Sequence, residues 1–239
     1  MLEKTKAIVI STIKYQEKSL IVKCFTETRG LKSYFIRDAF SSKRSVQKIA
    51  YFQPLTLLQI EADHKNKGGL SYLKEIKLFA PYYTIGSDIR KTTIVLFISE
   101  ILYSCIKEEE EENHTLYSFL ETALLWLDSH TETINFHLIL LLEITKFLGF
   151  YPALPQDSEI YFEMSEGVFI SHQTTTCLNQ QETLLFKKLL SLKFDTPGKI
   201  FHVTERQQLL TLLLNYYELH LGSFKKPKSL EILHEVFSV

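Results

Sequence analysis

The sequence predicts an α+β fold, in which a small five-stranded β-barrel comes first and a mainly α-helical part with one small hairpin follows. In the first 80 residues the apolar side chains come in short bursts, whereas residues 87–148 contain neither Gly nor Pro. The charge divides at the same place. Residues 1–80 hold 15 basic and 7 acidic side chains, net +8, and residues 81–239 hold 12 and 21, net −9. We therefore expect two domains, residues 1–80 and 81–239.

The N-terminal part contains five bursts of Ile, Val, Leu, Phe and Tyr separated by turn-like segments, which predict strands. The expected strands are residues 7–13, 20–25, 31–36, 54–60 and 70–79. Five short strands in this length are typical of a small closed barrel. Within the third, Lys32 and Tyr34 alternate with their neighbours, so we expect one strand face to be polar and aromatic while the other packs.

The later part predicts helices at residues 88–106, 115–129 and 133–148. Two further helix starts are indicated by a capping residue with Glu or Gln three positions later, Asn179 with Glu182 and Thr204 with Gln207. The helix at 204–219 is apolar on most sides and is expected at the centre of the bundle. Strands at 160–164 and 168–171 predict a hairpin inside an insertion of about residues 158–178, and a short helix at 229–237 ends the fold.

The three cysteines, Cys24, Cys105 and Cys177, are too few and too scattered for a disulfide framework, which favours a reducing compartment. No apolar signal region follows the start, and the longest apolar run covers only residues 138–142. We expect a cytoplasmic protein without a membrane segment.

No phosphate-binding glycine loop and no HExxH or GxSxG motif occurs, so no catalytic residue is predicted. A convergent active site would escape such a search, so an enzyme remains an alternative. His172 and Cys177 are the nearest mixed pair of metal-binding side chains, and two ligands do not make the four of a structural zinc site. The glutamates at 108–112 are interpreted as a solvated helix end rather than a mimic of nucleic acid.

The basic N-terminal part favours nucleic-acid binding, because Lys and Arg hold phosphates and exposed rings such as Tyr15 or Tyr34 stack unpaired bases. The alternative is that the rings fill the barrel and the lysines only solvate it. The predicted binding residues are Lys6, Lys14, Lys23, Arg29, Lys32, Tyr34, Arg37, Lys43, Arg44 and Lys48.

Several short segments, in this order along the chain, resemble the RecO family of bacterial DNA repair and recombination mediators. They are Thr5-Lys6-Ala7-Ile8-Val9-Ile10, Tyr15-Gln16-Glu17-Lys18-Ser19-Leu20-Ile21-Val22, Phe25-Thr26-Glu27, Arg29-Gly30-Leu31-Lys32, Phe52-Gln53-Pro54-Leu55, Phe147-Leu148-Gly149-Phe150-Tyr151-Pro152 and Lys228-Ser229-Leu230-Glu231-Ile232-Leu233.

The resemblance implies an N-terminal OB-fold barrel and a helical C-terminal domain without a catalytic residue. It also implies binding of single- and double-stranded DNA, annealing of complementary strands, and help in loading RecA onto DNA coated by single-strand-binding protein (SSB), in the cytoplasm at the nucleoid. RecR and the acidic C-terminal tail of SSB are the implied partners. By the sign of their charge alone, Lys146, Lys187, Lys188 and Arg206 are candidates for binding that tail.

Two departures from the family pattern matter. Many members bind zinc through two CxxC pairs, whereas residues 155–178 of this chain retain only Cys177. We therefore expect no zinc or other cofactor, and a hairpin held by packing. After Arg37 the chain continues with Asp38-Ala39-Phe40 instead of glycine and further basic residues. A different reading is a non-enzymatic scaffold whose basic barrel binds an acidic protein.

Overall fold

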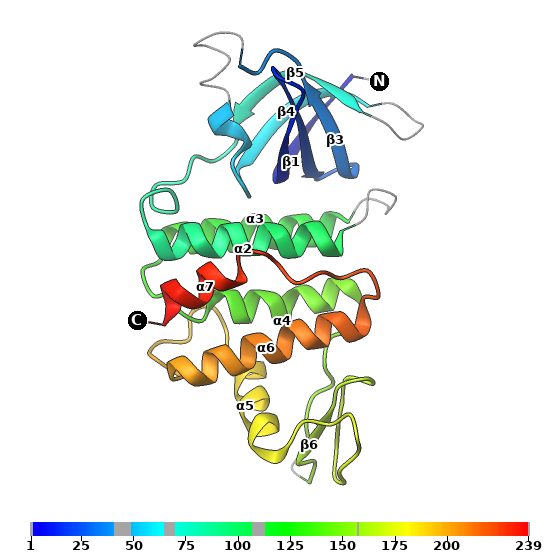
Figure 1. The fold of residues 1–239 in the computed structure, drawn as a ribbon, viewed down its shortest axis with the longest axis vertical. Coiled ribbons are helices and arrows are strands. Elements are labelled where there is room, and N and C mark those ends of the chain that lie inside the picture. The colour runs from blue at the N-terminus through cyan, green and yellow to red at the C-terminus, as the bar shows by residue number, and fades with distance from the viewer. Residues whose placement is uncertain (1, 41–48, 65–69, 107–112, 157, 239) are drawn as a thin grey trace. The chain divides into compact units, whose positions relative to one another are not determined.

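The computed structural model describes residues 2–40, 49–64, 70–106, 113–156 and 158–238. The chain forms two compact units, which we call unit 1 (residues 1–129 with 227–229) and unit 2 (residues 130–226 with 230–239) (Figure 1). Unit 1 therefore contains the barrel together with the first two helices. The domain boundary expected at residue 80 stays a prediction.

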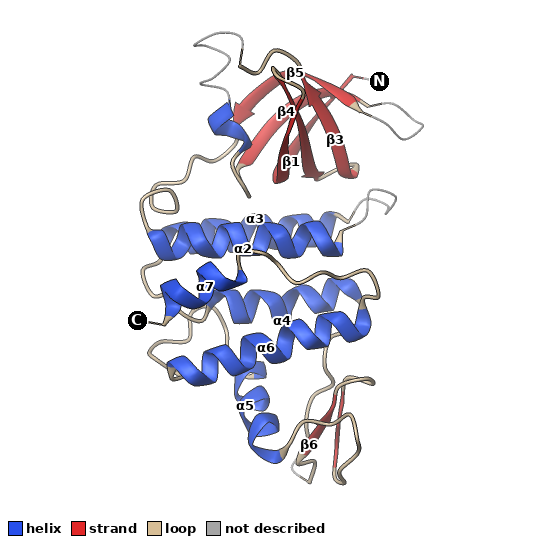
Figure 2. Ribbon diagram, in the orientation of Figure 1, coloured by secondary structure: helices blue, strands red, loops and turns tan. Residues whose placement is uncertain are grey.

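Unit 1 begins with a closed five-stranded barrel, which confirms the predicted OB fold; its strands are red in Figure 2. The strands are β1 (Leu2–Tyr15), β2 (Ser19–Thr26), β3 (Gly30–Ile36), β4 (Leu57–Asp63) and β5 (Ser71–Leu78). They pair in the order β1-β2-β3-β5-β4, and β1 and β4 also pair with each other. All these pairs are antiparallel except β3 with β5.

β1 is long enough to pair with β4 along its first half and with β2 along most of its length. Its register with β2 shifts between Val9 and Ser11, which is a β-bulge. Before the bulge Val9 lies opposite Cys24 and belongs to the barrel core, whereas after it Ile13 lies opposite Ile21 and is half exposed. Before the bulge the odd-numbered residues of β1 therefore face the core, and after it the even-numbered residues do.

The barrel core is filled by side chains from all five strands and from η1 (Ala50–Phe52), a 3-10 helix that the sequence did not predict. β4 begins at Leu57 rather than at the predicted residue 54, because Pro54 has no backbone N–H and Leu55 adopts a positive φ of 56°. The buried core residues are Ala7, Val9, Leu20, Val22, Cys24, Tyr34, Ala39, Phe52, Leu58, Ile60 and Ala62.

Helices α2 (Ile89–Cys105) and α3 (His114–Ser129) complete unit 1, within one residue of the predicted ranges at each end. The side chain of Asp88 caps α2 by accepting hydrogen bonds from the backbone N–H groups of Arg90 and Lys91. The ring of Phe25, on the outer side of β2, lies 6.0 Å from the ring of Tyr117 in α3. The helices thus cover one sector of the barrel wall.

The carboxylate of Asp128, in the last turn of α3, holds the segment that leads from the barrel into α2. It accepts hydrogen bonds from the backbone N–H groups of Tyr83 (2.8 Å), Thr84 (2.8 Å) and Ile85 (2.9 Å). The buried Lys91 donates to the backbone oxygen of Asp128 at 3.0 Å. Burial raises the pKa of Asp128, but these N–H bonds outweigh it and hold the pKa below its usual value.

Unit 2 contains four helices and one hairpin in its described residues. They are α4 (Phe136–Leu148), β6 (Tyr161–Glu163), β7 (Val168–Ile170), α5 (Gln180–Leu190), α6 (Val203–His220) and α7 (Leu230–Phe237). α6 is the central helix, as predicted, with Leu209, Leu213 and Tyr217 fully buried, although Leu219 is exposed. No helix in the described residues combines the length and the apolarity that crossing a membrane requires.

One of the two predicted capping boxes is present. Asn179 and Glu182 cap α5 as expected. The start predicted for α6 at Thr204 is wrong, because the side chain of Glu205 accepts from the N–H of His202 at 2.7 Å and the helix begins at Val203. α4 begins at Phe136, three residues after the predicted start.

We predict that Asp128→Asn lowers the free energy of unfolding by about 2–3 kcal/mol, because an amide presents a donor where the carboxylate accepts three N–H groups. Chemical denaturation measures the change. Asp195→Asn, an equal change at an exposed aspartate, is the control and should have little effect. Equal destabilisation by both substitutions would show that Asp128 does not anchor this segment.

Candidate nucleic-acid interface

The predicted binding residues do not share one face of the barrel. Lys43, Arg44 and Lys48 lie outside the described residues. The others, apart from Lys14, fall into three places: against the helices, at one end of the barrel interior, and on an open sector of the wall. Each place gives its residues a different role.

Lys6 and Lys23 lie against the helices of unit 1 rather than on an open surface. The Nζ of Lys6 forms an ion pair with Glu121 of α3 at 3.0 Å and lies 4.3 Å from the ring centre of Phe79. The Nζ of Lys23 lies 5.0 Å from the ring centre of Tyr103 in α2. These two lysines connect the barrel to the helices, and their contact with a nucleic acid stays a prediction.

Tyr34 is fully buried, so the prediction that its ring stacks bases is wrong. It lies opposite Val22 in the core, and its hydroxyl is 2.8 Å from Nε2 of His64. Burial raises the pKa of Tyr34. The predicted alternation along β3 is correct, but the faces are reversed: Tyr34 points inward and Phe35 outward.

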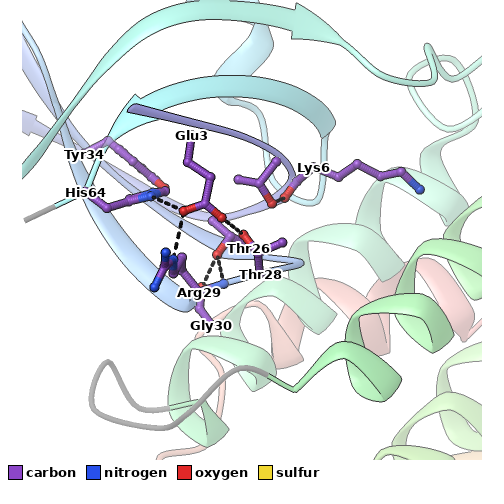
Figure 3. Close-up of polar contacts among 9 residues, drawn as sticks. Glu3, Lys6, Thr26, Thr28, Arg29, Gly30, Tyr34 and His64 are labelled. Carbon is purple, nitrogen blue, oxygen red and sulfur yellow. Dashed lines mark hydrogen bonds and ion pairs between the residues drawn. The ribbon is translucent and has the colours of Figure 1, made fainter. Parts of the chain in front are cut away.

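Arg29 gathers with Glu3, Thr28 and His64 at one end of the barrel (Figure 3), and with Lys32 they form what we call the Glu3 cluster. Glu3 accepts a hydrogen bond from Nε of Arg29 at 2.9 Å and another from the hydroxyl of Thr28 at 2.8 Å. Its other close neighbour is Nδ1 of His64, at 3.6 Å. Lys32 is included because it lies opposite the core residue Cys24 and because its positive charge lowers the pKa of His64. The members are Glu3, Thr28, Arg29, Lys32 and His64.

The electrostatics of the Glu3 cluster favour an ionised Glu3 and a neutral His64. Burial raises the pKa of Glu3, but the hydrogen bonds from Thr28 and Arg29 together bring it below its usual value. Burial also lowers the pKa of His64, and the positive charges of Arg29 and Lys32 act in the same direction against Glu3. At neutral pH the carboxylate of Glu3 therefore carries a full negative charge beside Arg29.

The open sector of the wall carries three aromatic rings in contact, which we call the aromatic row: Tyr15 of β1, Phe35 of β3 and Tyr72 of β5. The ring centres are 5.9 Å apart between Tyr15 and Phe35 and 6.2 Å apart between Phe35 and Tyr72, both edge to face. Tyr15 is 43% exposed and Tyr72 is 44% exposed. The sequence suggested Tyr15 and Phe35 but not Tyr72, because only the pairing of β3 with β5 brings Tyr72 beside Phe35.

Three cations lie beside the aromatic row: Lys18, Arg37 and Lys74. None of these three forms an ion pair with a carboxylate in the part of the chain that the structure describes. Lys14 lies on the opposite face of β1 from Tyr15, with its Nζ 5.5 Å from the ring centre of Phe40. Lys18, Phe35 and Arg37 line an open depression of about 670 Å³, and Phe35, Arg37 and Lys74 line a second one of about 520 Å³. Unpaired cations beside exposed rings are the combination that binds the phosphates and bases of single strands.

The remaining wall of the barrel carries cations that are already paired. Lys4 lies 3.5 Å from Glu61, and Lys77 lies 2.8 Å from Glu75. Both pairs lie on β1, β4 and β5, outside the aromatic row. The two depressions beside the rings are also lined by Glu17, Asp38 and Glu75, so the cations there lack an ion pair but are not the only charges beside the rings.

The hairpin of unit 2 does not fit a zinc site. The Sγ of its single cysteine, Cys177, accepts from the N–H of Thr174 and donates to the backbone oxygen of the same residue. The nearby Glu163 accepts hydrogen bonds from the hydroxyls of Ser165 (2.9 Å), Thr176 (2.5 Å) and Thr174. Among the described residues, no three His, Cys, Asp or Glu side chains gather where they could hold a metal ion.

The turn of this hairpin requires a glycine. Gly167 has a φ of +67°, and a Cβ there would lie 2.5 Å from the hydroxyl oxygen of Tyr216. Tyr216 in turn donates to the backbone oxygen of Phe150 at 2.8 Å, and Phe162 packs against Phe169 and Phe186. Packing and the Glu163 carboxylate together hold the hairpin.

The four candidates for binding an acidic tail all make contacts within unit 2. Lys146 pairs with Glu143 at 2.6 Å, and Lys187 and Lys188 donate to the backbone oxygens of Glu159 and Ile200. Arg206 is only 6% exposed and donates to the oxygen of Phe201, so it is not a surface candidate for binding the acidic tail. A depression of about 530 Å³ between α5 and α6 contains Glu182 and Gln207 in its lining but no Lys or Arg.

Two family models and several relatives match most of this chain. The model described as "Recombination protein O N terminal" matches residues 1–82, and "Recombination protein O C terminal" matches residues 86–231. A "DNA repair protein RecO" of Flavobacterium johnsoniae is 63% identical over 235 residues, covering 98% of this chain and 99% of the relative. That of Flavobacterium psychrophilum is 62% identical over 236 residues, covering 98% and 99%. That of Bacteroides fragilis is 36% identical over 243 residues, covering 99% and 100%.

We predict that Glu163→Gln lowers the melting temperature at pH 7 and that its effect shrinks as the pH falls. Burial raises the pKa of Glu163, but the hydrogen bonds from the Thr174, Thr176 and Ser165 side chains hold it at about 2, below the usual 4.5. A folded pKa below the unfolded one gives stability that is present above pH 4.5 and lost as the pH falls toward 2.

Thermal unfolding of both proteins between pH 7 and pH 2.5 tests this prediction. Glu166→Gln, at an exposed residue of the same hairpin, is the control and should leave the pH profile unchanged. A Glu163→Gln difference that stays constant over the whole range would contradict the proposed role of the carboxylate.

Proposed function

The chain belongs to the RecO family of DNA repair proteins, and from this membership we propose that it is a non-enzymatic recombination mediator that binds single- and double-stranded DNA and anneals complementary strands. The observation that carries the proposal is the aromatic row with its unpaired cations. Rings of this kind are platforms for unpaired bases, and cations beside them hold the phosphates between those bases.

Annealing requires that two strands be concentrated while their bases remain able to pair. Lys18, Arg37 and Lys74 supply neutralising charge without the rigid base-edge contacts that would block pairing. Stacking on a half-exposed ring holds one base face and leaves the hydrogen-bonding edge open. The mechanism therefore needs no catalytic residue and no metal, and we propose that the chain works without zinc.

The partners follow from the family. We propose that the protein acts in the cytoplasm at the nucleoid with RecR, and that it helps RecA to load on DNA coated by SSB after binding the acidic SSB tail. Lys146, Lys187 and Lys188 stay candidates for that tail, because each retains surface although it also makes internal contacts. The depression lined by Glu182 and Gln207 does not favour an acidic ligand.

The alternative is a scaffold whose basic barrel binds an acidic protein. Cations alone would serve either ligand, but an acidic peptide has no bases to stack on Tyr15, Phe35 and Tyr72. The exposed rings therefore favour nucleic acid.

We predict that Tyr72→Ala weakens binding of a single-stranded oligonucleotide by about 5- to 150-fold, the range expected for loss of one stacked base. Fluorescence anisotropy with a labelled oligothymidine measures the affinity. Tyr103→Ala is a matched control, because Tyr103 is also 44% exposed but lies on α2 under Lys23. Equal losses in the two variants would remove the aromatic row as the binding surface.

We also predict that Lys18→Glu with Arg37→Glu abolishes annealing and makes the affinity for single strands less dependent on salt. Each lost phosphate contact should reduce the slope of log K against log salt by about 0.7. The control is Lys4→Glu with Lys77→Glu, which makes the same change of charge at cations that are already paired.

Three outcomes would count against the proposal in different ways. Equal effects of the two double variants would indicate a general attraction rather than a local site. Equal affinity of the unaltered protein for a glutamate-rich peptide and for the oligonucleotide would favour the scaffold. A cleaved or modified product after incubation with a divalent ion would favour an enzyme.

A further inference from the structure

The turn between β2 and β3 presents a set of donors that converge on one carboxylate. Nε of Arg29 and the hydroxyl of Thr28 reach the two different oxygens of Glu3, at 2.9 and 2.8 Å (Figure 3). The hydroxyl of Thr26 accepts from the N–H of Arg29 at 3.1 Å and donates to the oxygen of Gly30 at 2.8 Å, which fixes the turn. The donors are thus held in place by the barrel.

A guanidinium and a hydroxyl on a fixed turn form a donor set suited to a phosphate. Lys32, whose charge lowers the pKa of His64, adds positive charge nearby. The Arg29 side chain is 47% exposed, so a ligand can reach it from solvent. Glu3 is 19% exposed and presents its oxygens to the donors from the inner side. A carboxylate occupies the place that a phosphate oxygen would take.

We propose that Thr28, Arg29 and Lys32 form a phosphodiester site, for which the carboxylate of Glu3 is an internal competitor. The inference rests on the proposed function, since the phosphate would come from the DNA strand held by the aromatic row. Arg29, in the turn before β3, and Phe35 in the aromatic row are six residues apart, about 20 Å along the strand, and Lys32 points to the opposite face of β3 from Phe35. A DNA strand held by the row therefore has to pass around the edge of the barrel to bring a phosphate to Arg29.

Competition from the Glu3 carboxylate distinguishes a free phosphate in solution from a phosphate that belongs to a bound DNA strand. Glu3 is part of the barrel, so its carboxylate has a high effective concentration at Arg29 and excludes dilute phosphate. A phosphate tethered to a base on the aromatic row has a comparable effective concentration and displaces it. Arg29 thus becomes a DNA contact only after the row has bound.

Affinity and salt dependence for a labelled oligothymidine test the proposal with Glu3→Gln, which removes the competing charge and keeps the shape. We expect roughly tenfold tighter binding and a salt slope steeper by about 0.7, one additional phosphate contact. Arg29→Gln added to Glu3→Gln should cancel both gains. Glu61→Gln is the matched control, because it removes one negative charge from the neighbouring strand at the Lys4 pair.

Equal effects of Glu3→Gln and Glu61→Gln would overturn the proposal. A second comparison does not depend on the folding of the Glu3 variant. In the otherwise unaltered protein Arg29→Gln should weaken oligonucleotide binding far less than Arg37→Gln. If the two losses are equal, Arg29 is an open contact and Glu3 does not compete.

A further measurement separates this inference from the proposed function. Inorganic phosphate should shift the Nε–H resonance of Arg29 in the NMR spectrum of the Glu3→Gln protein at concentrations that leave the unaltered protein unchanged. If it does so while no variant binds oligonucleotide, the phosphate site stands and the proposed function fails. If oligonucleotide binds but phosphate shifts both proteins alike, the proposed function stands and the competition is wrong.

Discussion

The parallel contact between β3 and β5 closes the barrel, and both functional features of unit 1 depend on it. Among the described residues two pairs are in register there, Tyr34 with Ser71 and Phe35 with Tyr72. The first pair faces inward and sets Tyr34 against His64, beside Glu3. The second faces outward and joins two rings of the aromatic row. A single short contact thus fixes an interior polar cluster and an exterior aromatic surface on opposite sides of the same wall.

The sequence predicted the number of strands, their approximate positions and most helices, because apolar periodicity and the distribution of Gly and Pro are local properties. The faces of β3 were not predictable, since a shift of one residue exchanges inner and outer side chains and Lys32, Tyr34 and Phe35 fit either arrangement. The start of α6 also failed, because Thr204 with Gln207 and His202 with Glu205 are both plausible caps. Tertiary packing decides which face of β3 points inward and which residue caps α6, because the local sequence is compatible with both alternatives.

The net charge of +8 over residues 1–80 includes two kinds of cation that composition cannot separate. Lys6 is neutralised by Glu121, which lies 115 positions later in the chain, and Arg29 by Glu3, which lies 26 positions earlier. Lys14 and Arg37 have no such carboxylate among the described residues. Which cations remain available to a ligand is therefore a property of the fold, and acidic residues of α3 contribute to it as much as basic residues of the barrel.

The bulge in β1 also limits how this barrel can vary in length. Val9 and Ile13 are both odd-numbered, yet one belongs to the core and the other to the open wall, because one additional residue is accommodated between Val9 and Ser11. Deleting that residue would keep the β4-paired half of the strand in place and rotate the distal half, so that Tyr15 would turn inward and Lys14 outward. Insertions and deletions in this short stretch would thus exchange a ring for a charge on the open wall, whereas the same changes in the β1–β2 turn would leave the wall intact.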